Sequence, residues 1–219
     1  MKQQRLSQGE GVVVTDDMMT QIKSRRSRRE FLDKAVSEDV INRIIEAGRY
    51  APSALNKQPW KFIVITNRDT IRKLSLVVKR KASIITRLLP LLRIVRPILR
   101  DPQVAGAIKK TISGDADNVF YDAPLLIFVV TEGRSRQYSQ TDCALASQNM
   151  MLYANSVGVS SCFIGRADLL SASRYAKSLI GLPRRHYIQA AIIFGYSPSS
   201  KEGVVIPERR RDNILNWIR

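Results

Sequence analysis

The spacing of apolar residues predicts two long helices in this chain. One begins after Ser37, which precedes two acidic residues and then an apolar stripe at helical spacing, and it is expected to end at Pro52. The other covers 142–157 and carries apolar residues on nearly every side, as a helix does when it is buried against a sheet or a partner subunit. Gly158 is the residue expected to cap its C-terminal end.

Four short apolar segments have the length and composition of strands. The first two are compact and apolar enough for the interior of a sheet. The predicted strands are 61–66, 124–131, 160–164 and 187–196. Strands and helices therefore alternate loosely along the chain, with no repeat of fixed period.

The segment 79–118 differs from the rest because basic residues are spaced through an aliphatic run. Pro90 and Pro97 interrupt it, so it is predicted to form kinked amphipathic helices. Eleven Lys or Arg residues and a single acid, Asp101, occur between positions 72 and 110. Two interpretations remain open: a solvated pair of surface helices, or a basic lid that receives anionic apolar substrates or an acidic protein.

Composition narrows the possible classes of protein. The chain has 219 residues, of which 44% are hydrophobic, enough for one domain with a substantial core. Cys143 and Cys162 show no CxxC spacing and His186 is the single histidine, which disfavours a structural zinc site, a Cys/His nucleophile pair and a disulfide scaffold. The net charge of +17 favours contact with polyanions or phosphate-bearing molecules. Nucleic acid is not expected, because the basic tract has no aromatic residues for base stacking.

Residues 1–19 are interpreted as an accessory N-terminal arm. They carry no clear hydrophobic period, and a short helix is predicted to begin at Asp16 or Asp17 and to continue through Ile22. The start of the chain lacks the apolar stretch of a signal peptide, and no run of 18 uncharged apolar residues follows. Secretion and membrane spanning are therefore not expected, and the cytoplasm is the expected location.

Two short segments on either side of the first long helix carry the candidate chemistry. Arg25-Arg26-Ser27-Arg28-Arg29 groups four guanidinium groups around a hydroxyl, a set suited to binding a dianion. Segment 51–60, Ala-Pro-Ser-Ala-Leu-Asn-Lys-Gln-Pro-Trp, places amide side chains in a loop bounded by prolines. Taken alone, the first could be a solvated face, and the second could be a helix terminator whose Trp60 fills the core.

In combination, these segments resemble the beginning of the nitroreductase family of flavin enzymes. That family begins with Arg-Arg-Ser-x-Arg, a helix, Ala-Pro-Ser-x-x-Asn-x-Gln-Pro-Trp and a strand, and this chain matches every fixed position. The resemblance covers most of residues 20–219. Its further motifs are Tyr121-Asp-Ala-Pro124, Asp142-Cys-Ala-Leu-Ala-Ser-Gln-Asn149, Gly158-Val-Ser-Ser-Cys-Phe-Ile-Gly165 and Pro207-Glu-Arg-Arg-Arg211.

The resemblance implies an α+β fold of three α/β/α layers with a mostly antiparallel central sheet. It also implies a domain-entwined homodimer that holds two FMN molecules at the subunit interface. Residues 20–219 would form this FMN-binding domain, with 79–118 as a basic helical insertion or lid. That tract lies where the family inserts variable helices that cover the flavin.

Each residue that matches a family motif has an implied role at the flavin. Arg29 matches the basic residue near the N1 and O2 edge of the ring, where a fixed cation favours the reduced anionic form. The implied phosphate ligands are Arg25, Ser27 and Arg209, accompanied by Arg26 and Arg211. The residues implied to reach the flavin of the other subunit are Pro52, Ser53 and Asn56.

The turn at Phe163, Ile164 and Gly165 matches the place where the family packs its backbone against the ring and offers an amide to N5. One common form of the family has an acidic residue and a glycine at the last positions, whereas this chain has Gly165 and Arg166. Arg166 could bind a nicotinamide phosphate, bind an acidic substrate, or face water. Trp60 is interpreted as core or interface packing.

The implied activity is that of an FMN-dependent oxidoreductase. Hydride from NADH or NADPH would reduce the flavin, and a nitroaromatic, quinone or related acceptor would then be reduced in a ping-pong cycle. No side chain is singled out as a catalytic acid, because the cofactor carries flavin chemistry and protons can come from water. Two alternatives stay open: reduction by an acidic donor such as ferredoxin or flavodoxin, and a basic peripheral membrane or partner-binding protein that keeps the fold.

Overall fold

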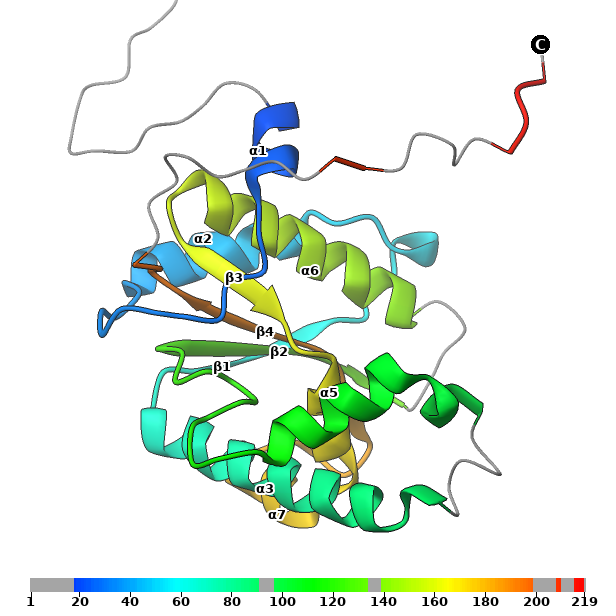
Figure 1. The fold of residues 1–219 in the computed structure, drawn as a ribbon. Coiled ribbons are helices and arrows are strands. Elements are labelled where there is room, and N and C mark those ends of the chain that lie inside the picture. Colours follow the sequence, from blue (N-terminus) through cyan, green and yellow to red (C-terminus); the bar gives the residue numbers. More distant parts are fainter. Residues whose placement is uncertain (1–17, 91–96, 134–138, 199–207, 210–214, 219) are drawn as a thin grey trace, which may run out of the picture.

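The computed structural model describes residues 18–90, 97–133, 139–198, 208–209 and 215–218 of the chain. The described helices are α1 (Met18–Ser24), α2 (Glu38–Arg49), α3 (Arg68–Arg87), α5 (Pro102–Ile112), α6 (Ser139–Ser156) and α7 (Arg174–Leu179). The described strands are β1 (Lys61–Ile65), β2 (Leu125–Glu132), β3 (Ser160–Phe163) and β4 (His186–Gly195). The 3-10 turns η1 (Ala54–Asn56), η2 (Pro97–Arg100) and η3 (Gly165–Ala172) lie between them (Figure 1).

The strands form one sheet in the order β1-β2-β4-β3, and every neighbouring pair is antiparallel. Helices α1, α2 and α6 lie on one face of the sheet, and α3, α5 and α7 lie on the other (Figure 1). Successive residues of β2 face opposite cores, so that Ile127 packs on the α2 and α6 side and Phe128 packs on the α3 side. The α+β class, the antiparallel sheet and the three layers expected from the sequence are confirmed.

The predicted elements are present with small differences at their ends. Each strand begins and ends within one residue of its prediction. The first long helix, α2, ends at Arg49 rather than at Pro52, because the backbone leaves helical angles at Tyr50 and the Ala51 amide bonds three residues back, to the carbonyl of Gly48 at 3.2 Å. The second, α6, begins at Ser139, almost one turn before the predicted start, and Gly158 follows its end with a φ of +81°. The predicted start of α1 at Asp16 or Asp17 lies outside the described residues.

The basic tract forms amphipathic helices as predicted, but the first of them starts well before residue 79. Helix α3 begins after Asn67, whose side-chain oxygen accepts a hydrogen bond from the Thr70 amide at 2.8 Å. Its buried side chains include Ile71, Leu74, Val78 and Ala82. Residues 91–96 lie outside the described part of the tract. Because α3 crosses position 79 without a break, the first part of the tract belongs to the layer that covers the sheet.

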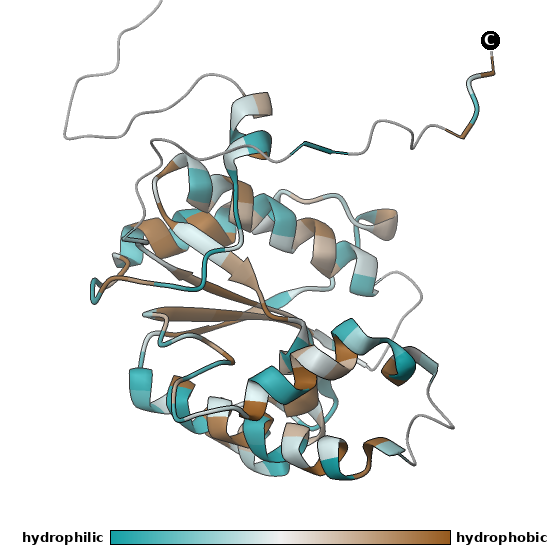
Figure 2. Cartoon of the chain, viewed as in Figure 1, coloured by the Kyte–Doolittle hydropathy of each residue, from teal (hydrophilic) through white to brown (hydrophobic). Residues whose placement is uncertain are grey.

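Large apolar side chains are exposed on the layer that contains α1, α2 and α6. We call this the α1–α2–α6 surface, and its exposed apolar residues are Met18, Met19, Ile22, Tyr50 and Leu145. Figure 2 shows that the strands beneath are largely apolar, as expected of a sheet covered on both faces. None of the helices in the described part of the chain combines the length and the apolar character needed to cross a bilayer.

Candidate functional site

The Arg25–Arg29 segment runs along the free edge of the sheet. Helix α1 ends at Ser24, and the chain then extends beside β3, where Ser27 forms a parallel bridge with Ser161. The amide of Arg28 donates to the carbonyl oxygen of Ser161 at 3.0 Å. Alternate side chains of an extended segment point to the same side. Arg25, Ser27 and Arg29 are therefore expected to share a side, and Arg28 to face the other.

All three of those residues influence the ionisation of Cys162, a buried residue of β3. Burial raises the pKa of the Cys162 thiol, and the positive charge of Arg29, a hydrogen bond from Ser27 and the charge of Arg25 each lower it in part. Arg166 has a smaller effect in the same direction. The positive charges of Arg25, Arg29 and Arg166 thus all act on Cys162 of β3. We call the region around Arg25, Ser27 and Arg29 the arginine corner.

The donors in this corner fit an oxyanion such as a phosphate. Guanidinium groups bind phosphate oxygens through paired hydrogen bonds, and the exposed hydroxyl of Ser27 adds a further donor. The buried hydroxyl of Ser161, on the strand beside Ser27, has no hydrogen-bond partner among the described residues. A buried hydroxyl without a partner is unusual in a folded protein, and this one leaves a hydrogen-bonding group unsatisfied on the strand beside Ser27.

Arg26 is held differently from its neighbours. Its Nη1 donates to the carbonyl oxygen of Lys23 at 2.6 Å and to that of Arg25 at 2.8 Å. The side chain is therefore turned back onto the end of α1, where a cation is favoured by the helix dipole. Sequence alone grouped Arg26 with the phosphate ligands, and nothing local distinguished it from Arg25.

The second candidate segment, 51–60, is a tight loop with unusual backbone angles. Leu55, Asn56 and Gln58 have φ values of +53°, +53° and +44°, a region that costs non-glycine residues about 1 kcal/mol or more each. Two hydrogen bonds made by Gln58 hold the loop in this conformation. The Gln58 amide donates to the Ser53 hydroxyl oxygen at 2.9 Å, and the Gln58 side chain donates to the Asn56 side-chain oxygen at 2.9 Å. The loop is thus a fixed feature of the surface, as a ligand-contacting loop needs to be.

The same loop is anchored to the beginning of α6 and borders a cavity. The Ala54 amide donates to Oδ1 of Asp142, a buried carboxylate, at 3.3 Å. A cavity of about 380 Å³ lies between the loop, the start of β1, the end of β2 and the first turn of α6. Trp60, at the end of the loop, is buried with α2 and α6, which confirms its interpretation as a packing residue.

Replacing Asp142 with Ala should loosen the 51–60 loop, because the Ala54 amide would lose its acceptor. A lost hydrogen bond of this kind costs about 1 kcal/mol, so we expect the Ala54 amide to exchange with solvent roughly fivefold faster. Hydrogen-exchange mass spectrometry on the loop measures this, and Asp142→Asn, which keeps an acceptor oxygen, is the matched control. Equal exchange in all three proteins would contradict the anchoring role.

Within one chain the two candidate segments lie far apart. Asn155 of α6 donates to Gln21 and Ser24 of α1, whereas Asp142 of α6 holds Ala54. Thirteen residues separate Asn155 from Asp142, which corresponds to about 20 Å along a helix. The loop also leads into β1 and the arginine segment pairs with β3, the two opposite edges of the sheet. Pro52, Ser53 and Asn56 therefore do not join the arginine corner of their own chain.

The turn after β3 lies beside the arginine corner. Phe163 is 42% exposed, and the Ile164 amide is bonded to the carbonyl of Ala191 at 2.8 Å. Open space surrounds Gly165, since nothing lies within 4 Å of the position that a Cβ would take there. Arg166 is held against α5, because its Nη1 donates to the carbonyl of Ala107 at 2.6 Å. Its other guanidinium donors leave the three roles named from the sequence open.

Two further residues of the predicted site lie near the C-terminus. Arg209 is exposed, and Arg211 falls outside the described residues. One neighbour of the site was not assigned a role from the sequence: Tyr121 lies beneath Arg29, with the guanidinium carbon 5.9 Å from the ring centroid. The motif Tyr121-Asp-Ala-Pro124 was the one signal in the sequence that pointed to Tyr121. The contact with Arg29 joins residues more than 90 positions apart, so no local pattern predicts it.

Comparison with known proteins identifies the family of this chain. The sequence pattern of the nitroreductase family matches residues 22–196. A protein assigned as an NADH dehydrogenase/NAD(P)H nitroreductase in Methanothermobacter thermautotrophicus is 28% identical over 200 residues, covering 89% of this chain and 84% of its own. A chloronitrobenzene nitroreductase of Comamonas testosteroni is 26% identical over 199 residues, covering 82% and 86%. A nitroreductase with bound FMN from Bacteroides fragilis has a TM-score of 0.69 at 23% identity, covering 94% of this chain and 100% of its own.

The chain belongs to the nitroreductase family, and it is an oxidoreductase of that type. The resemblance inferred from the motifs is thereby confirmed. At this level of identity the family is established, whereas the individual acceptor is not inherited from any one relative.

Proposed function

We propose that this protein is an FMN-dependent oxidoreductase that takes reducing equivalents from NADH or NADPH and passes them to a nitroaromatic, quinone or related acceptor in a ping-pong cycle. The observation that carries the proposal is the pairing of Ser27 with Ser161 of β3, which sets Arg25, Ser27 and Arg29 near Cys162 and next to the exposed turn at Phe163. That corner offers anion contacts and an open backbone edge together. The FMN in the Bacteroides fragilis relative supports the choice of cofactor.

In this proposal each residue of the corner has a distinct task. Arg25 and Ser27 would hold the phosphate through charge-assisted and hydroxyl hydrogen bonds, and Arg29 would provide a positive charge that favours the reduced ring. The backbone of Phe163, Ile164 and Gly165 would contact the ring and exclude water from it. Arg209 and Arg211 would add further cations for the phosphate, and Arg26 stabilises the end of α1. FMN, when bound, supplies the hydride chemistry.

A second copy of the chain completes the site. The loop that carries Pro52, Ser53 and Asn56 lies on the opposite edge of the sheet from the arginine corner, so it can serve only the corner of another chain. We place the contact with that copy on the α1–α2–α6 surface, because packing there would remove its exposed apolar side chains from water. A homodimer with two equivalent flavin sites follows from this pairing.

The basic tract borders the same site. Arg166, directly after the Phe163 to Gly165 turn, is bonded to Ala107 of α5, so α5 is fixed near the position proposed for the ring. The last turn of α5 carries Lys109 and Lys110. This contact supports the lid interpretation for α5, which would select anionic apolar acceptors by charge. We also propose that the protein acts in the cytoplasm, as expected from the sequence.

An absorption spectrum of the purified protein, followed by anaerobic addition of NADH and then NADPH, tests the function. Flavin bands that bleach on addition support the proposal and identify the donor. Flavin bands that persist with both nucleotides would contradict a nicotinamide donor and would favour an acidic protein donor instead. A colourless protein that FMN cannot reconstitute would contradict the proposal and favour a binding protein.

Neither cysteine should act as a nucleophile in this enzyme. Burial raises the pKa of the Cys143 thiol to about 12, with the nearby Asp142 carboxylate adding to the effect. Burial also raises the pKa of Cys162, although the arginine corner opposes that rise. Because the thiolate is the reactive form, we expect slow alkylation of both at about pH 8, with Cys162 accelerating first as the pH rises. Mass spectrometry after iodoacetamide treatment measures this, with the urea-unfolded chain as control, and folded-state rates equal to unfolded ones would contradict it.

A further inference from the structure

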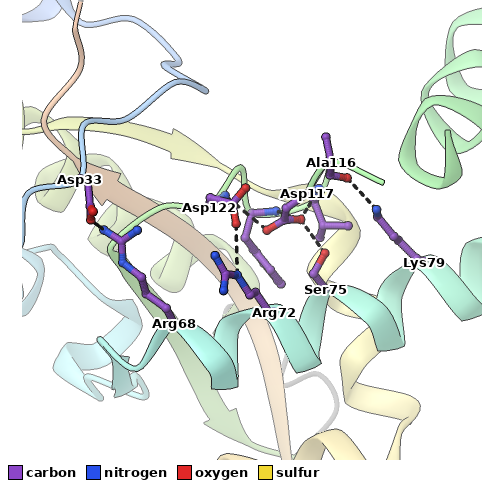
Figure 3. A network of polar contacts seen from close by, with 10 residues as sticks. Asp33, Arg68, Arg72, Ser75, Lys79, Ala116, Asp117 and Asp122 are labelled. Atoms are coloured by element: carbon purple, nitrogen blue, oxygen red, sulfur yellow. Dashed lines mark hydrogen bonds and ion pairs between the residues drawn. The ribbon is translucent and has the colours of Figure 1, made fainter. Parts of the chain in front are cut away.

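The carboxylate of Asp117 organises a turn that leads from the α3 layer to the arginine corner. Its Oδ1 accepts hydrogen bonds from the Ser75 hydroxyl at 2.5 Å, the Val119 amide at 2.9 Å and the Phe120 amide at 3.0 Å. Its Oδ2 accepts from the Asp122 amide at 3.4 Å. Figure 3 shows this carboxylate between α3 and the turn. One side chain therefore binds three amides of the same turn and one hydroxyl of a helix.

That turn needs such support because its backbone is unfavourable by itself. Tyr121 and Asp122 have φ values of +57° and +49°, in the left-handed region that is unfavourable for residues other than glycine. Val119 and Phe120, which precede them, are fully buried. The turn is thus fixed on one side by the core and on the other by Asp117, and the direction of the Tyr121 side chain follows from both.

Helix α3 adds two weaker contacts to the same turn. Nζ of Lys79 donates to the carbonyl of Ala116 at 2.6 Å, and Nε of Arg72 pairs with Oδ1 of Asp122 at 3.5 Å (Figure 3). Both are exposed and so contribute little to the free energy of folding. Ser75, in contrast, is buried, and its bond with Asp117 is the central one of the network.

Tyr121 connects this network to the arginine corner. The guanidinium of Arg29 lies over its ring, within the range of a cation–π interaction. Arg29 is exposed, and the Tyr121 ring is a contact that its guanidinium makes with a distant segment of the chain. A change in the turn at 117–122 would move the ring and would release the guanidinium.

We infer that Asp117 is a positioning residue that sets the reduction potential of the bound flavin by holding Tyr121 beneath Arg29. The inference rests on the proposed function, in which Arg29 provides a positive charge beside the FMN ring. A cation held there favours the reduced anionic ring. Loss of Asp117 would therefore lower the potential, although Asp117 does not itself touch the flavin.

The direction in which the reduction potential changes distinguishes a positioning role of Asp117 from a direct effect of its negative charge. Removing a negative charge near the flavin would by itself favour the reduced anionic ring and raise the potential. Asp117→Ala should instead lower it, with the affinity for reduced FMN falling about two- to fivefold more than that for oxidised FMN, as expected for one exposed cation–π contact. Asp115→Ala is the matched control, because Asp115 is an exposed carboxylate two residues earlier and its removal changes the charge equally.

A second pair of variants tests the ring directly and does not depend on the stability of Asp117→Ala. Tyr121→Phe keeps the aromatic face and should leave the potential unchanged, whereas Tyr121→Leu removes it and should lower the potential as Asp117→Ala does. The measurement is the midpoint potential of bound FMN by anaerobic dye-equilibrated reduction, with Arg29→Ala as the reference for complete loss of the cation.

The outcomes distinguish this inference from the function on which it rests. A chain that cannot be loaded with FMN would overturn both. If the chain binds FMN, is reduced by a nicotinamide and has a lower potential in Arg29→Ala, the proposed function stands. In that case an unchanged or raised potential in Asp117→Ala and in Tyr121→Leu overturns the positioning role alone.

Discussion

A Leu145→Glu variant should be monomeric and should lose nearly all affinity for FMN. Leu145 is 41% exposed on α6, within the α1–α2–α6 surface proposed as the dimer interface. A twofold interface would present the new carboxylate from both copies, and an uncompensated buried charge costs about 3–5 kcal/mol. Separation of the chains would remove the loop with Pro52, Ser53 and Asn56 from each arginine corner. Flavin binding should then fail together with dimer formation.

Sedimentation velocity and a titration with FMN measure the two effects on the same sample. Leu76→Glu is the matched control, because Leu76 is 64% exposed on α3 in the opposite layer and receives the identical substitution. We expect this control to remain dimeric and flavin-bound. A Leu145→Glu protein that keeps the oligomeric state and the flavin affinity of the unchanged protein would place the interface elsewhere.

Arg25→Ala should weaken FMN binding much more than Arg26→Ala. The two arginines are adjacent and carry the same charge, but Arg25 acts on the Cys162 corner whereas Arg26 is bound to the carbonyls of Lys23 and Arg25. A hydrogen bond between charged groups contributes about 1.5–3 kcal/mol, so we expect a rise in the Kd of about 10- to 150-fold for Arg25→Ala. Arg26→Ala should change the Kd only through the loss of overall charge.

Quenching of flavin fluorescence on titration of the apoprotein gives both Kd values. Repeating the titration at two salt concentrations separates the contact from long-range attraction, since the smaller effect of Arg26→Ala should vanish at high salt and that of Arg25→Ala should persist. Equal Kd values for the two variants at high salt would show that the pair acts only through its charge.

Much of the fold could be predicted because the relevant information is local. The apolar runs of β2 and β4 predict buried strands from composition alone, and the strand ends were placed within one residue. The motif around Ser27 and the loop at 51–60 identified the family, since the types and spacing of their residues are visible without any contact. The end of α2 was placed too late, because the backbone leaves helical angles at Tyr50 and a tight turn from Gly48 to Ala51 ends the helix before the proline does.

The individual roles within the site depend on contacts that have no local signature. Arg25 and Arg26 are alike in the sequence, and only the path of the chain from α1 to β3 separates them. The bond of Arg166 with Ala107 joins residues 59 positions apart, so no local pattern predicts it. The sequence by itself determined the elements, the family and the set of residue types for the site, because periodicity and motif spacing depend on neighbours along the chain. Tertiary structure alone decided which side chains converge, because a hydrogen bond or a cation–π contact between distant segments depends on how the layers pack.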